Sequence, residues 1–208
     1  QGGQLALGPG GRLEADGRQP ADFREHPLHL MQDLQHPLQI GLVPVRVRVA
    51  EPRQPREAFV PPAKRVIAYA GGPIEIAPGR SLLEARTIAK MLDAADLEAG
   101  DAVLEIGCGM GYTTALLARM AEAVVSVEDD PDLAADAEST LGSQGIDNAV
   151  VVTGPLAEGH ARAGPYDAIM IFAGVQVMPE DLTAQLKEGG RIVAIFMDER
   201  LGEVRRGL

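Results

Sequence analysis

Three glycines and two glutamates carry the pattern that could do chemistry in this 208-residue chain. The stretch "VLEIGCGMGY" places Gly107, Gly109 and Gly111 after Glu105, where an apolar run changes to a helical pattern. Glycine has no Cβ, so such a turn can fold tightly and lets a ligand approach the backbone. The spacing E-x-G-x-G-x-G differs from that of dinucleotide-binding loops and contains no Gly-Lys-Ser/Thr for a nucleotide triphosphate. A carboxylate at Glu105 would repel a phosphate and favour a cationic amino group.

The second glutamate, Glu128, closes the next apolar run, "VVSVE". An acid at this place can accept two hydrogen bonds from ribose hydroxyls. A ribose together with an amino group suggests S-adenosylmethionine as the ligand. Cys108 lies inside the glycine loop and is interpreted as small filler, because the sequence reveals no positioned base that would make it a nucleophile. The alternative interpretation is that Glu105 and Glu128 are only solvated strand ends.

The elements that must position these residues alternate between strand and helix. Helical spacing of Leu82, Ala85, Ile88, Ala89 and Leu92 predicts a first helix, with Ser81 as N-cap and Glu84 at the capping-box position. After it, the pattern predicts strands at 102–107, 123–128, 149–154, 166–172 and 189–197 and helices at 112–121, 131–145 and 179–186. Strands that are apolar on both faces and alternate with helices indicate a parallel sheet covered on both sides. We therefore expect a Rossmann-like, doubly wound, mostly parallel α/β fold that binds ligands at the carboxyl ends of its strands.

Composition divides the chain into two parts. Residues 1–52 are rich in Pro and Gly, lack periodicity, and begin with Gln, so we expect a disordered or non-native segment. Residues 53–208 form the second part, which is predicted to bind S-adenosylmethionine, and a short helix or turn within "REAFVPPAKRVIAYA" introduces it. His26, His29 and His36 lie in the Pro-interrupted first part and are interpreted as solvated, because zinc needs three or four converging ligands on a rigid frame. No metal is expected.

Charge and residue usage exclude several classes of function. The formal net charge is −11, and only 3% of residues are aromatic, which makes nucleic acid an unfavourable partner. No apolar run approaches the roughly 20 residues that span a bilayer, so no membrane association is expected. Cys108 is the single cysteine, which fits a reducing compartment. We expect a cytoplasmic, monomeric protein.

Six motifs, in order and spacing, resemble the protein-L-isoaspartate O-methyltransferase family from Pro55 to about Val193: "PREAFVPPAKR", "PGRSLLEARTIAKML", "EAGDAVLEIGCGMGY", "VVSVEDD", "GPYDAIMIFAG" and "LKEGGRIV". The resemblance implies that residues 53–208 are an S-adenosylmethionine-dependent methyltransferase domain. It would esterify the side carboxylate of isoaspartyl residues in damaged proteins, a step in protein repair. Protein or peptide substrates are the implied partners. Glu105, Gly107, Gly109 and Gly111 match the family's cofactor loop, Cys108 lies within it, and Glu128 matches the ribose acid.

The sequence departs from the family's pattern on both sides of the site. The family reads G-x-T-I-S-x-P before the first helix, whereas here Ser81 stands at the threonine, Leu83 at the serine associated with catalysis and Ala85 at the proline. The catalytic residue is therefore left unassigned. The family's Gly-Asp-Gly reads Gly154, Pro155 and Leu156, so adenine would be recognised by backbone and apolar contacts. The chain also ends at Leu208 where the family continues, which predicts a C-terminal truncation.

Three alternatives to an isoaspartyl methyltransferase stay open at this point. Leu83 is compatible with a different methyl acceptor on the same enzyme. A catalytically silent protein that keeps the fold, and with it the cofactor, is the second alternative. A nicotinamide-dependent dehydrogenase is the third. His160 could serve as a base, although a histidine at a helix end or on the surface is the simpler interpretation.

Overall fold

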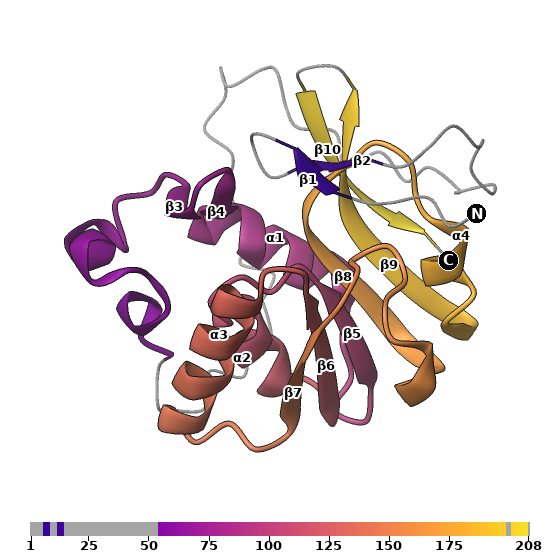
Figure 1. Cartoon of the computed structure of the whole chain (residues 1–208). Coiled ribbons are helices and arrows are strands. Elements are labelled where there is room, and N and C mark those ends of the chain that lie inside the picture. Colours follow the sequence, from indigo (N-terminus) through magenta and orange to yellow (C-terminus); the bar gives the residue numbers. More distant parts are fainter. Residues whose placement is uncertain (1–5, 9–11, 15–53, 199–200, 208) are drawn as a thin grey trace, which may run out of the picture.

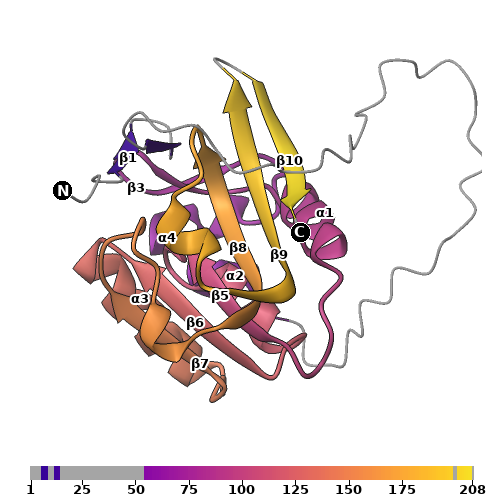
Figure 2. The ribbon, with the colours of Figure 1, turned by 90° about the vertical axis from the view of Figure 1, so that its right-hand side faces the viewer.

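A mostly parallel sheet forms the centre of the protein. The computed structural model describes residues 6–8, 12–14, 54–198 and 201–207 (Figure 1). The parallel strands are β5 (Ala102–Ile106), β6 (Ala123–Glu128), β7 (Ala149–Thr153), β8 (Tyr166–Val175) and β9 (Leu186–Asp198), in the spatial order β7-β6-β5-β8-β9. Strand β10 (Leu201–Gly207) pairs antiparallel with β9, and Figure 2 shows this two-stranded ribbon rising at one side of the sheet. The Rossmann-like α/β prediction is confirmed.

Both faces of the sheet are buried, which explains why its strands are apolar on both sides. One face packs against α1 (Ala85–Ala95) and α2 (Tyr112–Ala118), and the other packs against α4 (Glu180–Thr183) and the segment that follows β7. Val103 on β5 belongs to the first core, whereas its neighbour Leu104 belongs to the second. Because side chains alternate along a strand, Glu105 points to the first face, under α2.

Helix α3 (Pro131–Ser143) begins where β6 ends. Its N-cap is Asp130, whose carboxylate accepts hydrogen bonds from the backbone N–H groups of Asp132 and Leu133, and Pro131 stands at the first helical position. A capping acid followed by Pro is a strong signal for the start of a helix. Leu141 of α3 packs with Phe59 and Ala115, so α3 joins α2 to the segment that precedes the sheet.

The segment before β5 differs in part from the prediction. Two 3₁₀ helices, η1 (Arg56–Phe59) and η2 (Pro62–Ile67), confirm the expected short helix or turn. A two-stranded antiparallel hairpin follows, formed by β3 (Ile74–Ala77) and β4 (Arg80–Leu82), and the sequence analysis did not predict it. Ser81 therefore lies in a strand and is not the N-cap of α1.

Helix α1 starts later than predicted and buries a narrower face. Its N-cap is Glu84, whose carboxylate accepts from the Thr87 hydroxyl and not from a backbone amide. Ile88, Met91 and Ala95 are its buried residues, whereas Ala85 and Ala89 are exposed, which corrects the predicted face. Of the other residues in the predicted stripe, Ile88 is buried, Leu82 is buried at the end of β4, and Leu92 is half-buried against the first core.

Other boundaries moved by a few residues. The predicted helix at 179–186 is the single turn α4, because β9 already begins at Leu186. Within residues 1–52, two short strands are described, β1 (Ala6–Gly8) and β2 (Arg12–Glu14). Strand β2 pairs parallel with β8 at Gly174 and Val175. The sequence analysis predicted no strand there, and the division of the chain at residue 52 stays a prediction.

A short helix η3 (Ala161–Ala163) completes the described elements, between β7 and β8. Among the described residues, no helix is both long enough and apolar enough to cross a bilayer. His26, His29 and His36 lie outside the described residues. The part of the chain that is described contains no group of three or more His, Cys, Asp or Glu residues placed to hold a metal ion.

Candidate functional site

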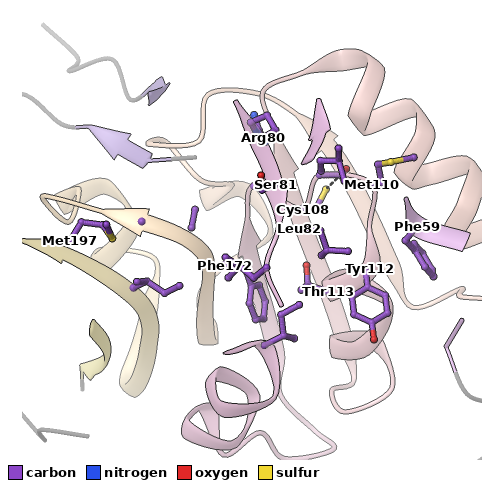
Figure 3. A pocket seen from close by; sticks show the side chains of 18 residues that line it. Phe59, Arg80, Ser81, Leu82, Cys108, Met110, Tyr112, Thr113, Phe172 and Met197 are labelled. Atoms are coloured by element: carbon purple, nitrogen blue, oxygen red, sulfur yellow. Dashed lines mark hydrogen bonds between the residues drawn. The ribbon is translucent and has the colours of Figure 1, made fainter. Parts of the chain in front are cut away.

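A cavity of about 170 Å³ opens at the carboxyl ends of β5, β8 and β9, which is the edge where the fold predicts a ligand. Three walls enclose it (Figure 3). The glycine loop and the start of α2 contribute Gly107, Cys108, Gly109, Met110, Tyr112 and Thr113. The hairpin and the turn after it contribute Ile76, Arg80, Ser81, Leu82 and Leu83. Phe59, Ile88, Phe172, Ala173, Gly174, Ile195 and Met197 complete the lining.

The glycine loop is held in a conformation that favours glycine. Gly107, Gly109 and Gly111 have φ angles of +75°, +56° and +88°, a region that costs other residues roughly 1–2 kcal/mol. A Cβ on Gly109 would lie 2.6 Å from Cδ1 of Ile76, so the loop and the hairpin approach each other closely at the cavity. Ile76 already occupies the space beside Gly109, so a side chain at position 109 would have to displace it.

Gly111 has a different structural role from Gly107 and Gly109. It is the N-cap of α2, and a Cβ there would lie 3.2 Å from Cβ of Ala137 on α3. It is not among the residues that line the cavity. The structure therefore gives it a packing role between α2 and α3, and a contact between Gly111 and a cofactor stays a prediction.

Glu105 is fully buried and does not line the cavity. Its Oε2 accepts hydrogen bonds from the hydroxyls of Thr114 at 2.6 Å and Ser126 at 2.7 Å. Burial raises the pKa of Glu105, although hydrogen bonds from Thr113, Thr114 and Ser126 oppose that rise. In this arrangement the carboxylate joins β5, β6 and α2 beneath the loop. Because Glu105 does not line the cavity, its predicted direct contact with a ligand amino group finds no support in the geometry and stays a prediction.

Glu128 lies at the end of β6 and is joined to the glycine loop. Its Oε2 accepts a hydrogen bond from the backbone N–H of Gly109 at 2.7 Å. Its Oε1 accepts from the Arg80 guanidinium at 2.5 Å and from the backbone N–H groups of Asp129 and Asp130, both at 3.1 Å. Burial raises the pKa of Glu128 and the Arg80 cation opposes that rise. The carboxylate is fully buried and is not among the residues that line the cavity, so its contact with a ribose stays a prediction.

Arg80 is a charged cavity-lining residue that the sequence reasoning did not single out. Its second nitrogen donates to Asp129 Oδ1 at 2.7 Å, so one guanidinium bridges two consecutive acids. These acids raise the pKa of Arg80 even though burial acts to lower it. The sequence shows Arg80 inside "GRSLLEA" but holds no local signal that its partners are 48 and 49 residues away. Only the hairpin brings the pair together.

Cys108 lines the cavity with its thiol buried. Its sulfur lies 3.7 Å from the carbonyl oxygen of Gly109. Burial raises the pKa of the thiol well above its usual range, and the carboxylates of Glu105 and Glu128 raise it further. A thiol that stays protonated is a poor nucleophile, which supports its interpretation as filler.

Leu83, which stands at the family's serine position, and Ser81 both line the cavity. The carbonyl oxygen of Leu83 accepts a hydrogen bond from Nη2 of the buried Arg56 at 2.5 Å. The Arg56 guanidinium also lies 4.9 Å from the centre of the Tyr112 ring, which fits a cation–π contact. Arg56 therefore fixes the backbone at Leu83 to the start of α2, and the sequence analysis did not single it out.

Gly154 and Pro155 lie at the same edge of the sheet but do not line the cavity. The backbone N–H of Gly154 donates to the Glu128 carbonyl at 2.9 Å, which places this turn beside the predicted ribose acid. Leu156 is buried in the second core. His160 is also absent from the lining, and its backbone bonds to Gln185 and Tyr166. The geometry thus assigns His160 to the support of β8.

Residues 29–202 match the family described as Protein-L-isoaspartate(D-aspartate) O-methyltransferase. The chain is 39% identical over 157 residues to a protein-L-isoaspartate O-methyltransferase of Pelotomaculum thermopropionicum, covering 74% of this chain and 69% of that protein. It is 40% identical over 167 residues to one of Rhodopseudomonas palustris, covering 80% and 77% of the two chains.

Solved structures show the same fold. A protein-L-isoaspartate O-methyltransferase superposes with a TM-score of 0.62 at 29% identity, over 69% of this chain, which spans 48% of that longer chain. A Plasmodium falciparum protein, described as a putative enzyme of this type in complex with S-adenosyl-L-homocysteine, also gives a TM-score of 0.62, at 20% identity, over 73% and 76% of the two chains. These likenesses agree with the topology described above.

Proposed function

Because the chain belongs to the protein-L-isoaspartate(D-aspartate) O-methyltransferase family, we propose that it methylates the free carboxylate of isoaspartyl residues in proteins, with S-adenosylmethionine as methyl donor. The observation that carries this proposal is the hydrogen bond from the Gly109 N–H to Glu128 at 2.7 Å. It joins the open glycine loop and the strand-end acid into one unit at the edge of the cavity.

The residues at this edge fit S-adenosylmethionine. Gly107 and Gly109 line the cavity with backbone alone, and Glu128 supplies carboxylate oxygens of the kind that ribose hydroxyls bind. We assign Gly107, Cys108 and Gly109 to the cofactor's close approach and Glu128 to its ribose. Gly154 and Pro155 are assigned to its adenine by position only. When bound, S-adenosylmethionine supplies a methyl group on a positively charged sulfur.

The chain's own contribution to such a transfer is positioning and exclusion of water. A carboxylate oxygen is already a competent nucleophile, so an in-line attack needs alignment more than a strong base. Leu82, Leu83 and Phe172 give the cavity an apolar wall that can exclude water from the acceptor. Tyr112, which also lines the cavity, is held by an edge-on contact with Phe59, at 5.8 Å between ring centres.

The experiment that tests the proposal has two stages. Isothermal titration with S-adenosylhomocysteine first measures cofactor-site binding. A methyl-transfer assay then compares an isoaspartyl peptide with the aspartyl peptide of the same sequence. Methylation of the isoaspartyl peptide alone is the expected result. Equal methylation of both peptides would indicate a different acceptor.

A catalytically silent binding protein is the second candidate. Leu83 offers no hydroxyl to an acceptor, and Pro155 stands where the family pattern has an acid. Tight binding of S-adenosylhomocysteine without methylation of either peptide would favour this candidate. We further propose a cytoplasmic protein, since the single cysteine, Cys108, is buried and needs no oxidising compartment.

A further inference from the structure

The carboxylate of Glu128 has too few free positions for the two hydroxyls of a ribose. Four donors reach it: the backbone amides of Gly109, Asp129 and Asp130, and the guanidinium of Arg80. Each carboxylate oxygen offers about two lone-pair positions, so the three donors on Oε1 fill it, whereas Oε2 accepts only from Gly109 and keeps one position. Two ribose hydroxyls can bind Glu128 as proposed only after one of the present donors leaves.

Arg80 is the donor that can leave without movement of the main sheet. The three amides belong to the glycine loop and to the turn that starts α3, whose positions the surrounding strands and helices fix. Arg80 instead extends from the hairpin β3–β4, which forms a separate two-stranded sheet. A rotation of its side chain can release Glu128 while Nη1 keeps its partner, Asp129.

The released guanidinium would face the cavity. Arg80 is the only charged side chain among the described residues that line the cavity, and Ser81 lies beside it at one end of the wall (Figure 3). The acceptor in the proposed function is a carboxylate, which needs a compensating positive charge in a protein of net charge −11. Leu83 cannot donate a hydrogen bond to it. A guanidinium suits this task because it binds carboxylates through paired N–H groups.

We propose that Arg80 is the specificity-determining residue for the anionic acceptor: ribose hydroxyls replace it on Glu128, and the freed guanidinium binds the acceptor carboxylate. This inference rests on the proposed function. It requires that the cofactor site fill before the acceptor binds well, and reciprocal linkage requires the acceptor to strengthen cofactor binding by the same factor.

The test measures binding and does not depend on turnover. Anisotropy of a fluorescent isoaspartyl peptide is titrated with the wild type, Arg80→Gln and Arg80→Lys, each with and without saturating S-adenosylhomocysteine. In the wild type, S-adenosylhomocysteine should tighten peptide binding about tenfold, and the peptide's neutral methyl ester should bind at least tenfold more weakly than the acid. Arg80→Gln should lose both differences. Both differences in Arg80→Lys should lie between those of the wild type and those of Arg80→Gln, because Lys keeps the charge and loses the paired N–H groups.

Calorimetry on the same variants distinguishes binding of the acceptor by Arg80 from binding of the cofactor by Arg80. Arg80→Gln should bind S-adenosylhomocysteine as tightly as the wild type or several-fold more tightly, because its competitor on Glu128 is gone. Arg86→Gln, on the exposed side of α1, is the matched control and should change nothing. Thermal melting of each variant establishes that it is folded.

Two results would overturn the inference. The first is tenfold weaker binding of S-adenosylhomocysteine by folded Arg80→Gln, which would make Arg80 a cofactor ligand. The second is normal peptide binding and normal acid-over-ester preference in that variant, which would contradict this inference and leave the proposed function intact. If the wild type binds S-adenosylhomocysteine but no isoaspartyl peptide, the proposed function fails together with it.

Discussion

The two walls that meet at Gly109 are held in place by different means. On the glycine-loop side, local backbone geometry and buried hydrogen bonds fix the wall: positive φ angles at Gly107 and Gly109, and Glu105 bound beneath them to α2 and β6. On the hairpin side, long side chains hold the wall from a distance: Arg80 on Glu128 and Asp129, and Arg56 on the Leu83 carbonyl.

The difference indicates a division of labour. A wall set by backbone conformation cannot adjust without local unfolding, which suits a cofactor that is always the same molecule. A wall held by guanidinium contacts can change partners by side-chain rotation, which suits an acceptor that arrives in many peptides. The predictions below test whether each wall behaves in this way.

Gly109→Val tests the rigid wall and should have the largest effect. The new side chain would clash with Ile76 and would adopt φ near +56°, which is unfavourable for Val. We expect S-adenosylhomocysteine to bind at least a hundredfold more weakly by calorimetry, equivalent to roughly 2.8 kcal/mol. Gly100→Val is the control, because a Cβ there meets nothing within 4 Å. Affinity within threefold of the wild type, in a folded variant, would refute a cofactor site at this loop.

Glu128→Ala tests the residue that connects the two walls through its bonds to Gly109 and Arg80. Hydrogen bonds to a charged group contribute roughly 1.5–3 kcal/mol each, so binding of S-adenosylhomocysteine should weaken about tenfold to a hundredfold. Glu138→Ala, on the exposed face of α3, is the matched control. A calorimetric change below twofold would mean that Glu128 only anchors Arg80 and the glycine loop.

Leu83→Ser tests the adjustable wall. A hydroxyl at this position would offer the acceptor carboxylate a hydrogen bond of roughly 1 kcal/mol, so methylation of isoaspartyl peptides should rise about fivefold from a low level. The readout is kcat/KM, with S-adenosylhomocysteine affinity as the internal control, since the cofactor wall is unchanged. Robust wild-type activity that the substitution leaves equal or lowers would show that other groups hold the acceptor.

A chain that begins at residue 54 tests whether the cavity's walls lie within residues 53–208. Strand β2 pairs with β8 at only Gly174 and Val175, so the melting temperature should fall by about 3 °C or less, equivalent to roughly 1 kcal/mol. Binding of S-adenosylhomocysteine should be unchanged. A large loss of stability or of binding would make the first segment part of the domain and a border of the site.

Glu105→Gln probes the layer beneath the rigid wall and should have the smallest effect. Burial raises the pKa of Glu105 above its ordinary value of 4.5. The folded state therefore binds its proton more tightly than the unfolded state, and the ionised carboxylate costs stability above that range but not below it. The variant should melt about 2 °C above the wild type at pH 8, equivalent to roughly 0.5–1 kcal/mol. This difference should shrink as the pH falls toward 4.5; a constant or growing difference would contradict a buried ionised acid.

The sequence by itself determined the sheet, the glycine loop and the family. Strands that are apolar on both faces, a capping Asp130 before Pro131, and glycines at 107, 109 and 111 are local signals, because each reflects the backbone conformation of its own neighbourhood. For the same reason the strands at 102–106 and 123–128 fell within a residue of their predicted ends.

Only the tertiary structure decided what each of these residues faces. Alternation along β5 turned Glu105 away from the cavity and under α2, whereas packing against Ala137 gave Gly111 a purpose that its motif does not reveal. The hairpin brought Arg80 onto Glu128 across 48 residues. Such pairings depend on the relative placement of separate elements, which no local pattern in the sequence encodes, and they determine which charge the cavity presents to an acceptor.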